Sequence, residues 1–377
     1  MKKELELYVH IPFCVKKCGY CDFLSFPGGS EAQRQYVETL KLEIGHCMTD
    51  PEEYRVSSVF FGGGTPSLLP AAWTAELLGL LQERFPFEES AEITMEANPG
   101  TVDAESLRLL REAGFNRLSF GCQSAEDEEL QRLGRIHSWK DFLMSWGLAR
   151  AAGFENLNLD LMSGLPGQTA ASWERTLRRA AELQPEHISA YSLILEEGTP
   201  FYRERESLDL PDEEEEREMY ECTGEILGEY GLLQYEISNY ARKGYECRHN
   251  LGYWTGKDYL GLGLGASSLL EGVRFHNTQD MKEYLASGGC TEQLRIVDER
   301  LSREERQAEF MILGLRLTAG VSELEFEKRF GQPLAEVYSE QIEKYRKLGL
   351  LKKENGRIAL TRRGISLSNT VMADFLP

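Results

Sequence analysis

Six short apolar segments alternate with helical patterns over the first half of this 377-residue chain. Between the first two, Tyr36, Val37, Leu40 and Ile44 recur at helical spacing. Consecutive strands that are separated by helices form a parallel sheet, because parallel neighbours need a long crossover connection. Six such units predict an α/β fold, an open or partial (β/α)6 barrel rather than a closed eight-fold one. The six predicted strands are residues 5–11, 57–63, 91–97, 116–122, 156–162 and 187–195.

Glycine-rich or polar residues follow these segments at their carboxyl ends. Gly62-Gly63-Gly64-Thr65-Pro66 ends the second, and the fifth contains Asp160 and runs into Gly164-Leu165-Pro166-Gly167. In parallel α/β folds the functional site gathers at the carboxyl ends of the strands. We therefore expect one converging pocket, although loops are polar in any protein and each end alone is equally well explained as an ordinary loop.

The strand and helix alternation weakens after residue 200. We divide the chain into a core (1–200), an extension of that core (201–300) and a C-terminal domain (301–377). The last part shows three helical patterns and then Asn355-Gly356 between two short strand patterns, which is a hairpin signal. Three helices and a hairpin predict a smaller winged-helix-like α+β domain. Such domains often bind DNA, but the net charge of −20 argues against a nucleic-acid partner.

Three cysteines, Cys14, Cys18 and Cys21, follow the first predicted strand with the spacing Cx3Cx2C. In a reducing compartment such a group indicates metal binding or catalysis rather than a disulfide. Structural zinc needs four ligands, and His10 could supply the fourth. An iron–sulfur cube fits the spacing better, because three thiolates leave one iron open for a chelating ligand. We expect a [4Fe–4S] cluster and keep zinc as the alternative.

The cysteine spacing, with Tyr20 before the last thiol, resembles the signature of radical S-adenosylmethionine (SAM) proteins, and the GGGTP segment strengthens the likeness. The resemblance implies a radical SAM barrel in which SAM chelates the open iron. Glycines suit such a site, because backbone groups can approach the methionine end of SAM without an intervening Cβ.

Four segments together resemble the oxygen-independent coproporphyrinogen III oxidase family over nearly the whole chain, including its HemN-type C-terminal domain. They are YVHIPFC, GGGTP, the Gln123 segment with Arg135, and LDLMSGLPGQT. Helix N-caps are the alternative role for Glu96 and Asp160, and a surface ion pair is the alternative for Arg135. The resemblance implies SAM contacts at Tyr8, Tyr20, Gly63, Gly64, Thr65, Glu96, Gln123, Arg135 and Asp160.

Two departures from that family separate this chain from the true oxidases. The oxidases carry a fourth cysteine where this chain has Phe23, and a substantial extension before a first strand that here begins about five residues in. Both departures resemble the HemW branch, whose members are regarded as haem chaperones. We therefore expect a protein that binds haem and passes it to an acceptor such as a respiratory protein. Oxidative decarboxylation of coproporphyrinogen III to protoporphyrinogen IX is the alternative, so enzymatic activity stays open.

Residues 249–254 contain HNxxYW, which resembles a HemW-type motif. Neutral imidazole is an ordinary axial ligand of haem iron, and Tyr253 and Trp254 offer flat apolar faces to a porphyrin. The alternative is a core hairpin with a capping histidine and two packed aromatic rings. His249 is the candidate haem ligand, and His276 and Cys247 are weaker ones.

The location follows from the N-terminus and from hydropathy. Glu4 and Glu6 interrupt what would be the apolar core of a signal peptide, and no run reaches the length of a membrane span. We expect a cytoplasmic protein without a membrane span, which reaches a membrane only through its haem-acceptor partner.

Overall fold

A computed structural model describes residues 2–47 and 49–377 of the chain. Its centre is a curved run of six parallel strands inside a twelve-stranded sheet of order β12-β11-β10-β9-β1-β2-β3-β4-β5-β6-β8-β7. All six predicted strands and the partial barrel are confirmed. The strands are β1 (Lys3–Ile11), β2 (Tyr54–Gly63), β3 (Phe87–Ala97), β4 (Arg117–Gln123), β5 (Asn156–Ser163) and β6 (His187–Ser192).

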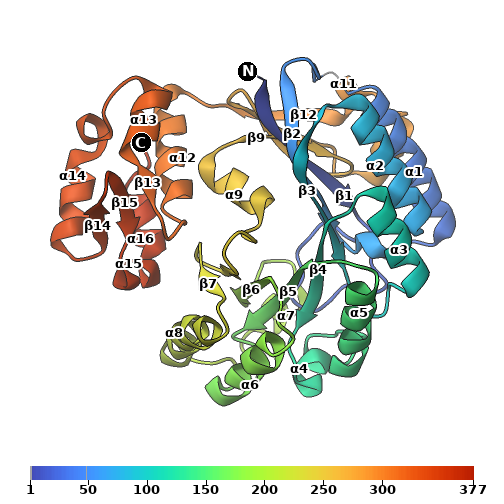
Figure 1. Cartoon of the computed structure of the whole chain (residues 1–377), viewed down its shortest axis with the longest axis horizontal. Helices are drawn as coiled ribbons and strands as arrows, with labels where there is room; N and C mark the ends of the chain where they lie inside the picture. Colours follow the sequence, from blue (N-terminus) through green and yellow to red (C-terminus); the bar gives the residue numbers. More distant parts are fainter. Residues whose placement is uncertain (1, 48) are drawn as a thin grey trace.

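Helices cover the outer face of this sheet (Figure 1). Strand β1 shows why: Leu5, Leu7, Val9 and Ile11 alternate with polar residues and are fully buried in the outer core. The helices are α1 (Ser30–Gly45), η1 (Pro66–Leu68), α2 (Ala71–Arg84), α3 (Ala104–Ala113), α4 (Asp127–Arg132), α5 (Trp139–Ala151), α6 (Ala170–Ala181), α7 (Pro200–Glu204) and α8 (Glu213–Glu229).

Polar side chains occupy the inner face of the barrel in rows set by the strand register. Glu6 lies opposite Ser58, and Ser58 opposite Glu92, near the amino ends of the strands. Asp160 is paired with Gly121 near the carboxyl ends. The barrel interior is therefore lined by groups that need hydrogen-bond partners. Glu6, Ser58 and Glu92 form the row near the amino ends, whereas Asp160 lies near the carboxyl ends.

Further strands widen the sheet on both sides. Beyond β6 lie β8 (Asn239–Ala241) and β7 (Leu233–Gln234), which run antiparallel. On the other side β9 (Asp258–Leu262) pairs parallel with β1, and β10 (Ser267–Leu270), β11 (Val273–Asn277) and β12 (Arg295–Arg300) continue antiparallel. Three short helices intervene: α9 (Arg248–Thr255), α10 (Met281–Ala286) and α11 (Thr291–Leu294).

The C-terminal region has its own apolar core, drawn from residues such as Met311, Phe326, Tyr338 and Ile358. A three-stranded antiparallel sheet and helices build it, as the winged-helix-like pattern predicts. In Figure 1 this region faces the inner side of the barrel, with α9 between them. Its elements are α12 (Arg303–Gly314), β13 (Val321–Ser322), α13 (Glu323–Phe330), α14 (Leu334–Lys347), β14 (Leu351–Glu354), β15 (Arg357–Leu360), α15 (Arg362–Ser366) and α16 (Ser368–Ala373).

Within residues 2–47 and 49–377, no helix combines the length and the apolar character that crossing a bilayer requires.

Candidate functional site

The three thiols lie in an irregular loop that leaves the carboxyl end of β1. All are free and half-buried, and burial raises the pKa of Cys21. The backbone of Cys14 donates to Phe26 O at 3.1 Å, which closes the loop on itself. The Cys14 Sγ atom lies 3.5 Å from Thr65 Oγ1, at the glycine-rich end of β2. The loop therefore holds the Cys14 thiol against the end of the next strand.

An open cavity of about 130 Å³ lies at the carboxyl ends of the strands. Eleven of the twelve residues predicted for the cluster and SAM line it, and Lys16, Lys17 and Phe23 contribute from the cysteine loop. Tyr8 is the exception: it lies below the cavity, and its hydroxyl pairs with His10 Nδ1 at 3.1 Å. The predicted residues that line the cavity are Cys14, Cys18, Cys21, Tyr20, Gly63, Gly64, Thr65, Glu96, Gln123, Arg135 and Asp160.

Glycine is required where the β2 end approaches the cysteine loop. A Cβ on Gly64 would lie 2.6 Å from Phe13 O, and one on Gly63 would lie 2.4 Å from the His10 ring. Gly63 also has φ = +112°, which side-chain-bearing residues rarely adopt. Its N–H donates to Glu96 Oε2 at 3.1 Å. The backbone of the glycines in the GGGTP segment thus lies between the thiols and the Glu96 carboxylate.

Two carboxyl groups face the cavity from β3 and β5. Burial, and then the charge of Asp160, raise the pKa of Glu96 to about 8. Burial also raises the pKa of Asp160, although Ser119 Oγ and Asn158 Nδ2 donate to its two oxygens at 3.1 and 2.8 Å. Acidic groups held half-buried in a converging position are poised to receive hydroxyl or ammonium donors from a ligand.

Arg135 connects three walls of the cavity. It donates to Asn98 Oδ1 and Gly121 O, each at 2.5 Å, and lies 3.8 Å from Cys18 Sγ. Asn98 Nδ2 in turn donates to Thr65 Oγ1 at 2.7 Å. Asn98 belongs to a polar strand end that the sequence places at the expected pocket, but no role was predicted for it, because a single amide after a strand carries no motif of its own.

The alternative roles for three of these residues are wrong. Glu96 and Asp160 lie within β3 and β5 and cap no helix. Arg135 bonds to buried backbone and amide oxygens rather than to a surface carboxylate. Gln123 lies at a register shift in β4 with φ = +69°, and this bulge is what brings its side chain to the cavity.

The donor set also bears on the choice of metal. His10 uses both ring nitrogens, Nδ1 with Tyr8 and Nε2 with Leu24 O at 2.9 Å, so none is left to complete a zinc site. Three thiols around an open, glycine-lined cavity instead fit a cluster with one iron left for a ligand.

The HNxxYW motif forms helix α9, not the hairpin that we considered. His249 is 2% exposed, stacks on Phe60 of β2, and its Nδ1 and Nε2 pair with Ser58 Oγ at 2.9 Å and Tyr253 OH at 3.0 Å. Burial, and then Arg117, lower the pKa of His249 to about 3. The imidazole is therefore neutral and fully partnered inside the barrel.

Helix α9 closes the barrel at the amino ends of its strands. The Glu92 carboxylate accepts from the backbone N–H groups of Arg248 and His249 at 3.1 and 3.3 Å, so it caps the helix. Gly252 packs directly on Glu6, because a Cβ there would lie 1.8 Å from Glu6 Oε1. This segment forms a helix rather than a hairpin because the buried Glu92 carboxylate satisfies two of its N-terminal donors.

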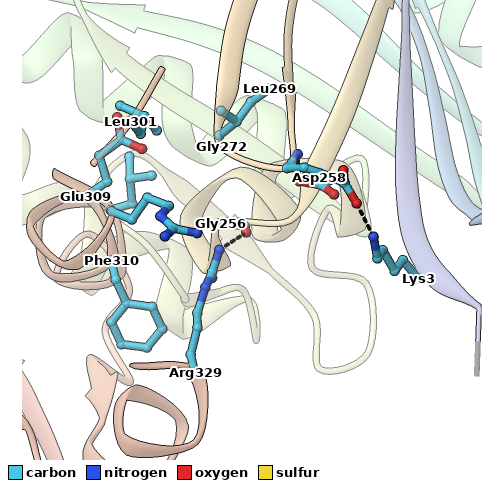
Figure 2. Close-up of a pocket in the computed structure, with 12 residues that line it drawn as sticks. Lys3, Gly256, Asp258, Leu269, Gly272, Leu301, Glu309, Phe310 and Arg329 are labelled. Carbon is cyan, nitrogen blue, oxygen red and sulfur yellow. Dashed lines mark hydrogen bonds and ion pairs between the residues drawn. The ribbon is translucent and has the colours of Figure 1, made fainter. Parts of the chain in front are cut away.

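The C-terminal region holds the other end of α9. Arg329 of α13 donates to Thr255 O and Gly256 O at 3.1 and 2.8 Å, and Figure 2 shows its guanidinium reaching Gly256. Arg316 lies 4.3 Å above the Trp254 ring. The motif helix is thus fixed by the barrel at one end and by the C-terminal region at the other.

The two weaker candidates for the haem ligand, Cys247 and His276, lie in different parts of the fold. Cys247 is fully buried, donates to Glu92 Oε1 at 3.4 Å, and burial raises the pKa of its thiol. His276 is on β11 at the other side of the sheet, paired with Asp298 at 2.7 Å.

Family comparisons agree with this architecture. The model of the radical SAM superfamily matches residues 8–180, and that of the HemN C-terminal domain matches residues 301–367. The curved parallel sheet, the three-cysteine loop at its carboxyl end and the appended small domain define a radical SAM protein with a HemN-type C-terminal domain.

Curated relatives narrow the family further. The chain is 39% identical to the heme chaperone HemW of Bacillus subtilis over 98% of each chain. It is 36% identical to that of Lactococcus lactis over 100% of this chain and 98% of the relative. The chain belongs to the HemW family. Among solved structures, coproporphyrinogen III oxidase (HemN) from Escherichia coli, described as a radical SAM enzyme, has a TM-score of 0.86 at 27% identity, covering 99% of this chain and 90% of that one.

Proposed function

We propose that this protein is a haem chaperone that carries a [4Fe–4S] cluster and SAM, binds haem and transfers it to an acceptor such as a respiratory protein. The observation that carries the proposal is the convergence of the three thiols, the glycine loop and two half-buried carboxyl groups on one cavity in a member of the HemW family. We place the protein in the cytoplasm, with any membrane contact made through its acceptor.

Cys14, Cys18 and Cys21 would hold the cluster, and the open iron would face the cavity. When bound, the cluster and SAM supply one-electron radical chemistry. The chain's own part is to bind and orient. Backbone groups at Gly63 and Gly64 can contact the methionine end of SAM, whereas Glu96 and Asp160 accept from its donor groups.

The remaining predicted contacts complete this arrangement. Tyr20 and Thr65 flank the thiols, and Gln123 and Arg135 close the opposite wall, where the guanidinium lies beside Cys18. Tyr8 acts one layer below, by holding His10 under the glycine loop. These roles support our assignment of the cavity to SAM rather than to haem.

His249 is the haem ligand that the motif predicts. In the described conformation its ring has no free nitrogen, so ligation requires α9 to withdraw from the barrel. Tyr253 and Trp254 would then become available to the porphyrin face as well.

Anaerobic reconstitution tests the cluster assignment. We expect the wild type to take up about four irons and four sulfides and to show iron–sulfur absorption. Cys14→Ala, Cys18→Ala and Cys21→Ala should each lose it, and Cys290→Ala, a half-buried thiol outside the cavity, should keep it. Stoichiometric zinc in the anaerobically purified wild type, without iron–sulfur absorption, contradicts the proposal.

Haem transfer and oxidase activity are separated by a second measurement. The likeness to HemN favours coproporphyrinogen III decarboxylation as a second candidate, and Phe23 in place of the fourth cysteine counts against it. Reconstituted protein is given coproporphyrinogen III, SAM and a reductant, or haem alone. Stoichiometric haem binding without vinyl products supports the chaperone, whereas turnover to protoporphyrinogen IX overturns it.

A further inference from the structure

A chain of hydrogen bonds, buried at its centre and part-buried toward its ends, runs through the barrel from the start of α9 to the SAM cavity. The Cys247 N–H donates to Tyr235 OH at 3.3 Å, and that hydroxyl pairs with His187 Nε2 at 2.8 Å. His187 Nδ1 pairs with Asn158 Oδ1 at 2.6 Å. Asn158 Nδ2 then donates to Asp160 Oδ1 at 2.8 Å. Four bonds thus join the HNxxYW helix to a carboxylate that lines the cavity.

The chemistry of the groups gives this chain one direction. The Asp160 carboxylate accepts, so Asn158 must turn its amide nitrogen toward it and its oxygen toward His187. His187 therefore carries its proton on Nδ1, and its Nε2 accepts from the Tyr235 hydroxyl. Tyr235 oxygen in turn accepts from the Cys247 N–H. Every donor points toward Asp160, and such aligned bonds strengthen one another.

Burial keeps the two central links, His187 and Asn158, in this state, whereas Tyr235 is partly exposed. His187 and Asn158 are 0% and 1% exposed, so water cannot replace a lost partner. Burial, and then the nearby Arg117 charge, lower the pKa of His187 far below its usual range, which keeps the ring neutral. A second donor, Ser119 Oγ, fixes the other Asp160 oxygen and itself accepts from Asn158 at 2.6 Å. Asp160 is held by groups that themselves have no freedom to turn.

We infer that His187 and Tyr235 are positioning residues for SAM, which orient Asp160 through Asn158 and tie its position to the docking of α9. The inference rests on the proposed function in one respect, that Asp160 receives donor groups of SAM. Neither His187 nor Tyr235 lines the cavity, so each acts only through the bonded chain.

The chain makes SAM binding and α9 docking mutually dependent. If α9 withdraws, Tyr235 loses the Cys247 N–H, and the hydroxyl is free to turn away from His187. The hydrogen-bonded chain that orients the Asp160 carboxylate is then broken. Because coupling between two equilibria is reciprocal, SAM bound at Asp160 must favour the docked helix by the same factor. Withdrawal of α9 is what haem ligation by His249 requires, so SAM and haem binding oppose one another.

Tyr235→Phe tests the inference, because it removes only the hydroxyl at the centre of the chain. With the reconstituted protein, we expect the Kd for SAM, measured by equilibrium dialysis, to rise about tenfold. Tyr240→Phe, a change at a buried tyrosine of β8 outside the chain, should leave it unchanged. His187→Gln, which can keep one bond but not both, provides a second variant and should weaken SAM binding as well.

Hydrogen exchange separates positioning from a general structural defect. Adding SAM should slow amide exchange in residues 248–255 of the wild type and of Tyr240→Phe, but not of Tyr235→Phe. Equal SAM affinity and equal protection in Tyr235→Phe and His187→Gln overturn the inference while the proposed function stands. Failure of the wild type to bind SAM at all overturns the proposed function itself.

Discussion

The Glu96 carboxyl makes the stability of the cofactor-free protein depend on pH. Its pKa is about 8 in the folded protein, above the ordinary 4.5, so the folded state holds a proton that the unfolded chain releases. The free energy of unfolding must therefore fall as pH rises from about 4.5 to about 8. We expect Glu96→Gln to raise it by about 1–3 kcal/mol at pH 8 and to change it little near pH 5.

Urea unfolding at the two pH values measures this difference. Glu89→Gln, at an exposed position of the same strand, should stay within about 0.5 kcal/mol of wild type at both. A Glu96→Gln effect that is the same at pH 5 and pH 8 would show that the carboxyl is ionised throughout.

Gly64 carries a steric requirement that can be isolated. In Gly64→Ala the new Cβ meets backbone atoms, Phe13 O at 2.6 Å and Phe13 N at 2.9 Å, which cannot rotate away. We expect a loss of about 1–3 kcal/mol in urea unfolding. Gly79→Ala is the matched control, because no heavy atom lies within 4 Å of its Cβ, and alanine in helix α2 should stabilise by up to about 1 kcal/mol. A similar loss of stability in both variants would mean that the loss comes from the backbone conformation of glycine and not from the contact with Phe13.

Residue types that occur in few structural or chemical roles are the ones whose role can be predicted from the sequence. Closely spaced cysteines and a run of glycines exclude most ordinary roles, so the sequence alone is enough to assign them to one pocket. Asn98 could not be assigned in this way, because its importance depends on Arg135, which reaches it from a loop 37 residues later. Gln123 was predicted only through the family resemblance, because no residue in the segment indicates the bulge in β4 that places it.

At the scale of elements, helix α9 packs into the end of the barrel, and His249 stabilises this packing. His249→Ala removes two buried hydrogen bonds and the stacking on Phe60. We expect the free energy of unfolding at pH 7 to fall by about 2–4 kcal/mol in urea unfolding. Haem affinity of this variant is therefore informative only under conditions in which it remains folded.

The pH dependence of this loss has a definite sign. The folded pKa of His249 is about 3, below the ordinary 6.5, so the unfolded chain binds the extra proton between these values. The wild type must lose the corresponding stability as pH falls from about 6.5 toward 3, and His249→Ala does not. The gap between the two proteins should narrow in that window. His46→Ala, at the exposed end of α1, should track the wild type, and a gap that stays constant would contradict the burial argument.

Strands with local patterns were predicted, and long-range elements were not. Apolar runs separated by segments with helical spacing predict the six parallel strands, and the structure confirms each of them. The pairing of β9 with β1 joins residues more than 200 positions apart. Helix α9 has eight residues, and the carboxylate that caps it, Glu92, lies 156 positions before Arg248. No local pattern can show such a partner, which is why a hairpin was an equally good prediction.

At the scale of the whole molecule, the barrel and the C-terminal region meet around α9. Figure 2 shows the cavity between them, with Asp258 and Gly256 on the barrel side and Glu309, Phe310 and Arg329 on the other. The guanidinium of Arg329 caps the helix that closes the barrel, so movement of the C-terminal region acts directly on the motif. The C-terminal region therefore contacts α9 directly, through Arg329 at its C-terminal end and through Arg316 above Trp254.

Arg329→Gln tests this contact. The variant loses charge-assisted bonds to the carbonyls that end α9, and we expect the free energy of unfolding to fall by about 1–2 kcal/mol. Amide exchange should become faster in residues 248–255 and in α12 while α1 to α6 keep their rates. Arg363→Gln, an exposed change in α15, is the control. If haem binding requires α9 to withdraw, Arg329→Gln should also bind haem faster than wild type in stopped-flow absorbance. Faster exchange without faster haem binding would mean that haem enters by a route that leaves α9 docked.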